Sequence, residues 1–460
     1  MPPPSVSASF YQDLERLEAL AAAPVTSAAG LGRVLSGMYS KAANAEFAQY
    51  DIAALSKVAP DLIYRLFDLR LVLRSRIADF EARGMMTSEV TQGLRDVFRI
   101  LRYVSDMLGE ISIGHGRLAE HEPPLRGFTG TQQNTLVNDA FYKGSELPFQ
   151  SGDVLLVRGR AHNSAAIARI GDVDCQFSHT GIVYIDDAGS HWLVESLIED
   201  GAVISRLGRA LEHGIVRAVL YRHKDTELAA RAAKVIHDHV AQSLAFPGRR
   251  ILYDFSMQLD ERRRLFCSKL VRLAFHKASN GTYAMPSYPT KISLKNRDFL
   301  ERIGVKTDKT YAPGDIDLEP AFDLVAEWQD YRETSHVRMQ DFTMDKVFEW
   351  MDARGMRFEE TAAIQLVSRL GRFSAYFSEG AKEALSSVLP KVPINMPRKT
   401  VAAVAMLHKT AEPICRELQE LEWRCISETG LPLHGKEIFA ALDAIRTREG
   451  NQIGYLVARG

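Results

Sequence analysis

The segment Phe266-Cys-Ser-Lys-Leu-Val-Arg-Leu-Ala-Phe-His276 decides how the middle of this chain is interpreted. Its leucines and its alanine recur at helical spacing, and Asn280-Gly281 follows as a stop signal, which predicts a helix with Cys267 at its start. The unpaired backbone N–H groups and the dipole of a helix start favour a negatively charged sulfur. Cys267 is therefore a candidate nucleophile.

The other three cysteines are weaker candidates. Cys415 and Cys425 lie in amphipathic helical sequence and are predicted to be inert packing residues, while Cys175 lies in a loop. Four cysteines without a CxxC pair do not form a disulfide framework, which favours a reducing compartment. The run Arg262–Arg264 adds positive charge upstream of Cys267, or forms a solvated helix entrance.

Short apolar segments separated by turns rich in Asp and Gly precede this helix. They span residues 153–158, 180–185, 191–195, 202–205 and 216–221. Closely spaced strands with such turns predict an antiparallel sheet or a small barrel. A helix from about Thr226 to Leu244 is expected to follow them.

A cysteine nucleophile needs a base and a group that orients the base. His179 is the candidate base, because it stands at a strand entrance and is followed by Gly181, which leaves its face open. Glu195 lies on the next predicted strand. We expect it to accept the Nδ1 proton of His179 and to hold the ring in position.

Taken in order, these elements resemble the circularly permuted papain-like cysteine hydrolases of the YiiX/YebB type. The matching motifs are Gly152-Asp153-Val154, Ser178-His179-Thr180-Gly181-Ile182 and Cys267-Ser268-Lys269-Leu270-Val271, and Tyr253-Asp254-Phe255 is similar to the family's segment before the cysteine helix. The resemblance covers roughly residues 147 to 290. It implies a bacterial-type fold related to NlpC peptidases and to lecithin:retinol acyltransferase, with the chain order permuted.

The resemblance also implies the site. It makes Cys267 and His179 catalytic, with Glu195 as the third polar residue, and we expect Ser178, Tyr253 and Ser268 to contact the substrate. No cofactor is required for this chemistry. The chain departs from the family in a long insert, Gly159 to Phe177, which is expected to shape the cleft or to act as a lid.

Both flanks of this central part have helical texture. Apolar stripes at 62–80 and 90–111 predict an antiparallel helical hairpin. The expected fold class is α+β, with a helical bundle at 1–122, a linker at 123–146, a permuted papain-like domain at 147–312 and a helical region at 313–460. We expect the flanks to pack on the central domain and to limit access to its cleft, because a striped hairpin alone leaves apolar surface exposed.

The expected function is hydrolysis or acyl transfer at an amide or ester bond through a Cys267 thioester. The substrate is a peptide, a lipid or an acylated molecule. The alternative is a catalytically vestigial binding or scaffold protein whose helical flanks recognise a partner or a membrane surface. Basic residues interleave with apolar ones at Arg65, Arg70, Arg74 and Arg76, which keeps a membrane surface among the expected partners.

Composition excludes other classes. The formal net charge of −1 gives no basic field for nucleic acid. The sequence carries no predicted cleaved secretory signal and no predicted transmembrane segment, so we expect a cytoplasmic protein or one exported without such a signal. Cys175 and His179 have the spacing of half a zinc site, but no second half follows, and no metal is expected.

Overall fold

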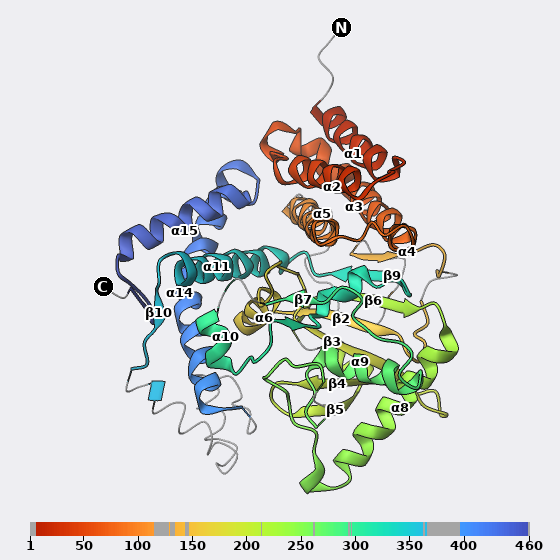
Figure 1. Ribbon diagram of the computed structural model, residues 1–460. Helices are drawn as coiled ribbons and strands as arrows, with labels where there is room; N and C mark the ends of the chain where they lie inside the picture. Colours follow the sequence, from red (N-terminus) through yellow and green to blue (C-terminus); the bar gives the residue numbers. More distant parts are fainter. Residues whose placement is uncertain are drawn as a thin grey trace.

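A computed structural model describes residues 6–114, 128, 134–142, 147–212, 214–260, 263–292, 295, 297–361, 364–365 and 396–458. A central sheet lies between N-terminal helices at the top of Figure 1 and C-terminal helices at its left. The expected α+β class is confirmed. Most of the expected linker, residues 123–146, lies outside the described residues. Residues 366–395 of the expected C-terminal helical region also lie outside them.

The sheet has seven antiparallel strands in the order β1-β9-β6-β2-β3-β4-β5. Their bounds are β1 (Thr135–Val137), β2 (Val154–Gly159), β3 (His179–Ile185), β4 (His191–Leu197), β5 (Gly201–Arg206), β6 (Ile215–His223) and β9 (Phe322–Gln329). Inner strands read as almost continuous apolar runs because both faces are buried. Val154 and Leu156 face one core, and Leu155 and Val157 face another.

Two strands lie outside the limits expected for the central domain. β9 pairs with β6 in the middle of the sheet, and β1 pairs with the outer side of β9. The sheet therefore includes residues both before 147 and after 312, and the two added strands are neighbours at the same edge. β9 was hard to recognise because it carries Asp323, Glu327 and Gln329, polar residues that a buried strand seldom contains.

Helices cover the sheet and its ends. The N-terminal bundle consists of α1 (Val6–Ala22), α2 (Ala28–Ala43), η1 (Phe47–Gln49), α3 (Ile52–Ser75), α4 (Ile77–Ala82) and α5 (Ser88–Gly114). The central part adds α6 (His162–Ala168), α7 (Leu207–Leu211), α8 (Thr226–Leu244), η2 (Pro247–Arg249), α9 (Cys267–Ala278), β7 (Thr290–Lys291), α10 (Arg297–Ile303), β8 (Lys309–Thr310) and η3 (Pro313–Leu318). α3 packs on α5, as expected for the predicted hairpin.

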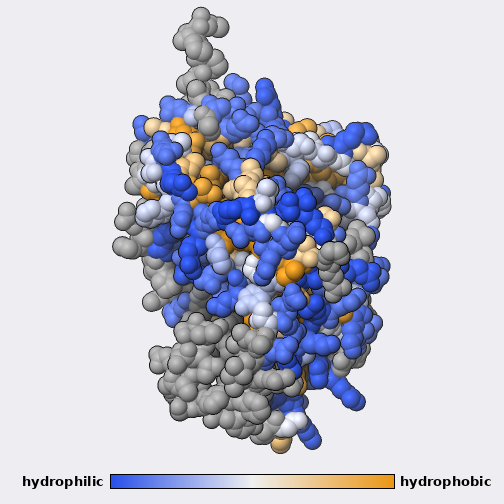
Figure 2. All heavy atoms as spheres, turned by 90° about the vertical axis from the view of Figure 1, so that its left-hand side faces the viewer, coloured by the Kyte–Doolittle hydropathy of each residue, from blue (hydrophilic) through white to orange (hydrophobic). Residues whose placement is uncertain are grey.

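The described residues after β9 form helices and a small three-stranded sheet. This region contains α11 (Thr334–Ala353), β10 (Arg357–Phe358), α14 (Arg398–Thr429), α15 (Gly435–Glu449), β11 (Gln452–Ile453) and β12 (Leu456–Val457). α14 packs on α6, α10 and α11, so that this region contacts the central domain. The face at the left of Figure 1 is mainly hydrophilic, and hydrophobic residues show only in patches (Figure 2).

Buried ion pairs join the N-terminal bundle to the sheet. Arg102 of α5 makes two hydrogen bonds to the carboxylate of Asp317 in η3, at 2.9 and 3.0 Å. Arg70 of α3 pairs with Glu327 of β9 at 3.1 Å, and both side chains are fully buried. Each charge lies where solvation is lost, so it is stable only with its partner in place. The expectation that the bundle packs on the central domain is confirmed.

These contacts remove the basis for a membrane-surface helix. Arg74 is buried and donates hydrogen bonds to the carbonyl oxygens of Ile316 and Glu319, each at 2.9 Å. Arg76 donates to Ala23, and Arg65 pairs with Glu18. Together with Arg70, all four arginines that suggested a lipid-facing stripe are engaged by the protein itself.

We predict that Arg102→Met destabilises the protein by about 3–5 kcal/mol, because it leaves Asp317 and Glu327 buried without this partner. The urea midpoint of unfolding measures the effect. Arg416→Met is the matched control, since Arg416 pairs with Glu412 at the exposed surface, and it is expected to cost less than about 1 kcal/mol. Equal midpoints for the two variants would contradict the role assigned to the buried pairs.

Candidate active site

Cys267 is the first residue of α9 and is 4% exposed. The N-cap position is Phe266, which provides no side-chain acceptor, so the first-turn N–H groups are not capped by a side chain. α9 packs against β3, β4 and α8. This packing presents the thiol to the beginning of β3, with backbone N–H groups beside it.

His179 opens β3, and Glu195 lies in the neighbouring strand β4. The register pairs Gly181 with Glu195, so Glu195 is the diagonal neighbour of His179 on one face of the sheet. His179 Nε2 lies 2.7 Å from Glu195 Oε2. A Cβ atom at Gly181 would lie 2.9 Å from Leu193 Cδ1, so the close packing of β3 on β4 here leaves no room for a side chain.

The expected contact of Glu195 with Nδ1 was wrong, because the carboxylate contacts Nε2. The diagonal position of Glu195 brings its oxygen to the far side of the ring. The nitrogen that remains for the thiol is Nδ1, and the nearby Cys267 raises the pKa of the imidazole. The structure thus brings all three predicted catalytic residues together.

The thiol and the imidazole stabilise each other's charged forms. Burial by itself lowers the pKa of His179, but the hydrogen bonds and charges of Cys267 and Glu195 raise it to about 10. Burial raises the pKa of the Cys267 thiol, yet contacts with His179, Ser268 and the Thr180 backbone bring it below its usual value. Each group thus favours the charged form of the other.

The other cysteines differ in this respect. Burial raises the pKa of Cys175 to about 11 and that of Cys415 to about 12, which keeps both thiols protonated at neutral pH. The run Arg262–Arg264 contributes less than expected to the lowered pKa of Cys267. Arg263 and Arg264 are exposed, the main causes of the lowered Cys267 pKa lie elsewhere, and Arg262 lies outside the described residues.

A buried ion pair fixes the segment that precedes the cysteine helix. Lys269 Nζ lies 2.6 Å from Asp254 Oδ2, and both side chains are 3% exposed. This pair holds residues 253–255 against the first turn of α9. Tyr253 and Ser268, two of the residues expected to contact substrate, lie beside Cys267 in the wall of one cavity.

That cavity is apolar and encloses about 760 Å³, its open mouth included. Besides the 253–257 segment, its walls come from the insert after β2, Ile198, the start of α9, α10, residues 310–313 and residues 396–407, most of which lie in α14. The side chains that define it include Ala166, Ile167, Phe266, Phe299, Ile303, Met396, Val404 and Leu407. Sequence reasoning missed the contribution of α10 and α14, because no motif marks these residues.

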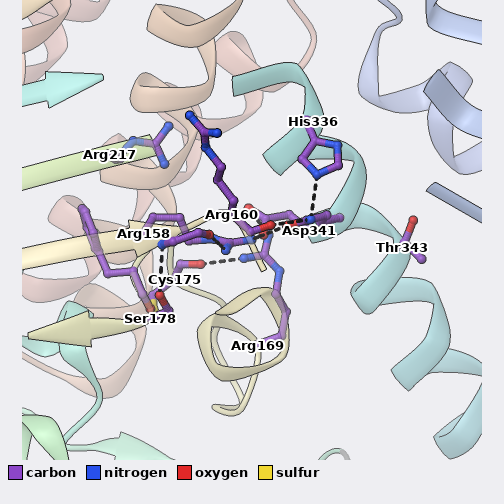
Figure 3. A network of polar contacts seen from close by, with 12 residues as sticks. Arg158, Arg160, Arg169, Cys175, Ser178, Arg217, His336, Asp341 and Thr343 are labelled. Carbon is purple, nitrogen blue, oxygen red and sulfur yellow. Dashed lines mark hydrogen bonds and ion pairs between the residues drawn. The ribbon is translucent and has the colours of Figure 1, made fainter. Parts of the chain in front are cut away.

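The insert from Gly159 to Phe177 folds into α6 and a turn, and it forms one wall of this cavity. Figure 3 shows the polar network that holds it: Arg158 and Arg169 converge on Asp341 of α11. Arg169 also donates to the carbonyl oxygen of Cys175 at 2.6 Å. The network therefore anchors both the insert and the chain that leads into His179.

Ser178, the third residue expected to contact substrate, does not line the apolar cavity. It lies with His179 and Glu195 in the wall of a second cavity. Its hydroxyl accepts a hydrogen bond from the Gly159 N–H at 3.4 Å. The expected substrate-binding residues are thus divided between two cavities that adjoin the Cys267–His179 pair.

Among the described residues, no group of three or more His, Cys, Asp and Glu side chains is placed to hold a metal ion. Cys175 instead donates its thiol to the carbonyl oxygen of Phe177. None of the helices in the described part of the chain has the length and apolar character needed to cross a membrane.

Comparison with known proteins agrees with this arrangement. Residues 148–345 match the model of a family described as "permuted papain-like amidase enzyme, YaeF/YiiX, C92 family". The matched range includes β9 and much of α11, beyond the limit of 312 expected from sequence. A search of curated proteins gave no match. Solved structures gave none either. The part of the chain from residue 148 to residue 345 is therefore similar to the permuted papain-like amidase family.

Proposed function

We propose that this protein is a cysteine amidase that releases a long apolar acyl group from an amine. The observation that carries the proposal is the position of Cys267 in the wall of an almost wholly apolar cavity, next to its pairing with His179. The similarity of residues 148–345 to an amidase family supports the amide bond. The cavity supports the nature of the acyl group.

In the first step the Cys267 sulfur attacks the amide carbon, forming a C–S bond and a tetrahedral oxyanion. First-turn N–H groups of α9, including that of Cys267, are the proposed donors to this oxyanion. His179 then gives its Nδ1 proton to the leaving nitrogen, the C–N bond breaks, and the free amine departs. The acyl group remains on the sulfur as a thioester.

In the second step water attacks the thioester carbon, and neutral His179 takes a proton from it. The C–S bond breaks, the carboxylic acid leaves, and the thiolate–imidazolium pair returns. Glu195 holds the ring through Nε2 in both steps, so that Nδ1 stays directed at the reacting atoms. No cofactor enters this cycle.

The apolar walls are the reason to prefer a long acyl group over a peptide. A peptide chain brings N–H and C=O groups that need partners once they are buried, and unpaired ones cost free energy. The described walls consist mainly of Ile, Phe, Met, Leu, Val and Ala side chains, which suit a hydrocarbon chain. Each buried methylene of such a chain contributes about 0.8 kcal/mol to binding.

The same observations disfavour a vestigial site. Lys269–Asp254 is a buried ion pair, and Glu195 is a largely buried carboxylate. Both are expensive groups to bury. The free-energy cost of burying these groups is explained if they hold the nucleophile and the base in a reactive geometry. A scaffold protein needs no thiol with a lowered pKa.

We predict that Cys267 alkylates faster with iodoacetamide at pH 7 than Cys175, Cys415 or Cys425, because its lowered pKa leaves more thiolate. His179→Ala removes the main cause of that lowering, so the Cys267 rate at pH 7 should fall and its pH midpoint should rise. Glu195→Gln is expected to have a smaller effect. Site-resolved mass spectrometry measures all four rates, and a Cys267 that ranks last contradicts the proposal.

We also predict that kcat/KM for N-acyl glycines rises about two- to fourfold per added methylene until the cavity is full. Val404→Trp should abolish this rise for long chains while leaving acetyl substrates unaffected, because Val404 is a wall residue of the cavity. Lys409→Trp is the matched control, since it places the same side chain at an exposed position of α14. Chain-length-independent rates with rapid cleavage of peptides would instead indicate a peptidase.

A further inference from the structure

The second cavity lies on the face of the sheet that carries His179 and Glu195. It encloses about 880 Å³, its open mouth included, and shares no lining residue with the apolar cavity. Its floor is formed by alternate residues of β2 and β4, among them Leu155, Val157 and Leu193.

The polar groups of this cavity differ from those of the first. Ser164, Ser178 and Ser205 contribute hydroxyl groups, and Arg209 of α7 contributes a guanidinium. Arg209 is exposed, and it has no hydrogen bond or ion pair to any residue that the structure describes. The one carboxylate in the lining, Glu195, is already occupied by His179. The cavity therefore offers a free cation beside apolar walls.

The chemistry of the proposed reaction indicates which half of the substrate each cavity would hold. The acyl group stays on the sulfur after the C–N bond breaks, so it occupies the cavity lined by Cys267. The leaving nitrogen takes its proton from His179, so the amine departs on the side of the imidazole. The second cavity borders this imidazole, since its lining includes His179 and the Glu195 that holds its Nε2.

We propose that the second cavity binds the amine half of the substrate, and that this amine carries an anionic group which pairs with Arg209. The inference rests on the proposed function and adds the identity of the leaving group. A carboxylate or a phosphate meets the requirement, because a guanidinium binds both through paired N–H groups. The apolar floor accommodates the carbon atoms between the nitrogen and the anion.

The test uses two pairs of dodecanoyl amides that differ in charge. N-dodecanoylglycine is compared with N-dodecanoylglycinamide, and N-dodecanoylphosphoethanolamine is compared with N-dodecanoylethanolamine. The full-length protein should prefer the anionic member of at least one pair in kcat/KM. The preferred pair distinguishes a carboxylate from a phosphate.

Arg209→Ala should lower kcat/KM for the preferred anionic amide by roughly three- to tenfold, mainly through KM, and leave its neutral partner unchanged. Arg206→Ala is the matched control, because Arg206 stacks on Trp192 and does not line the cavity. Ser205→Phe, which narrows the cavity, should weaken both amides of a pair but not a methyl ester of the same acid, whose leaving group is small.

Two outcomes overturn the inference while leaving the proposed function intact. The first is equal kcat/KM for the anionic and neutral amides, and the second is equal loss of both in Arg209→Ala. Failure of the proposed function gives a different result: the wild-type protein would not hydrolyse p-nitrophenyl dodecanoate, or would do so equally well after Cys267→Ser.

Discussion

The contact between the Cys267 thiol and the His179 imidazole is the interaction on which the rest of the site depends. Burial opposes ionisation of both groups, since it raises the pKa of the thiol and lowers that of the imidazole. Their mutual contact, with Glu195 on the other side of the ring, raises the pKa of His179 and lowers that of Cys267 in spite of burial. The charged pair therefore persists only while α9 and β3 stay packed together, which makes the reactivity of Cys267 a property of the whole fold.

The flanking helices serve this pair in two ways. The N-terminal bundle is fixed to the sheet by buried ion pairs such as Arg102–Asp317, and η3, which carries Asp317, begins next to Ala312 in the wall of the apolar cavity. The C-terminal α14 forms another wall of the same cavity. α14 thus helps directly to enclose the Cys267 side chain, and the N-terminal bundle contributes through η3.

The sequence allowed the meeting of Cys267, His179 and Glu195 to be predicted because its signals are local. A cysteine at a helix start, a histidine at a strand entrance and a glutamate on the next strand each follow from short patterns, and the three residues meet in the structure. The nitrogen that contacts Glu195 was not predictable, because it depends on the strand register, in which Gly181 rather than His179 is opposite Glu195.

Long-range features were predicted less well. β9 was missed because Glu327 is buried only through its pairing with Arg70 and Arg102, which are distant in sequence. The arginines of α3 suggested a lipid-facing stripe for the same reason: their partners are carbonyl and carboxylate groups far along the chain. The walls that α10 and α14 add to the cavity follow from tertiary packing alone.

The most direct test of the account is the intact mass of the protein during turnover of N-dodecanoylglycine, quenched with acid at times from milliseconds to seconds. The account predicts a transient increase equal to one dodecanoyl group, located by peptide mapping on Cys267 and absent from Cys267→Ser. Fatty acid release that proceeds without such an adduct, or an adduct on another residue, would contradict it.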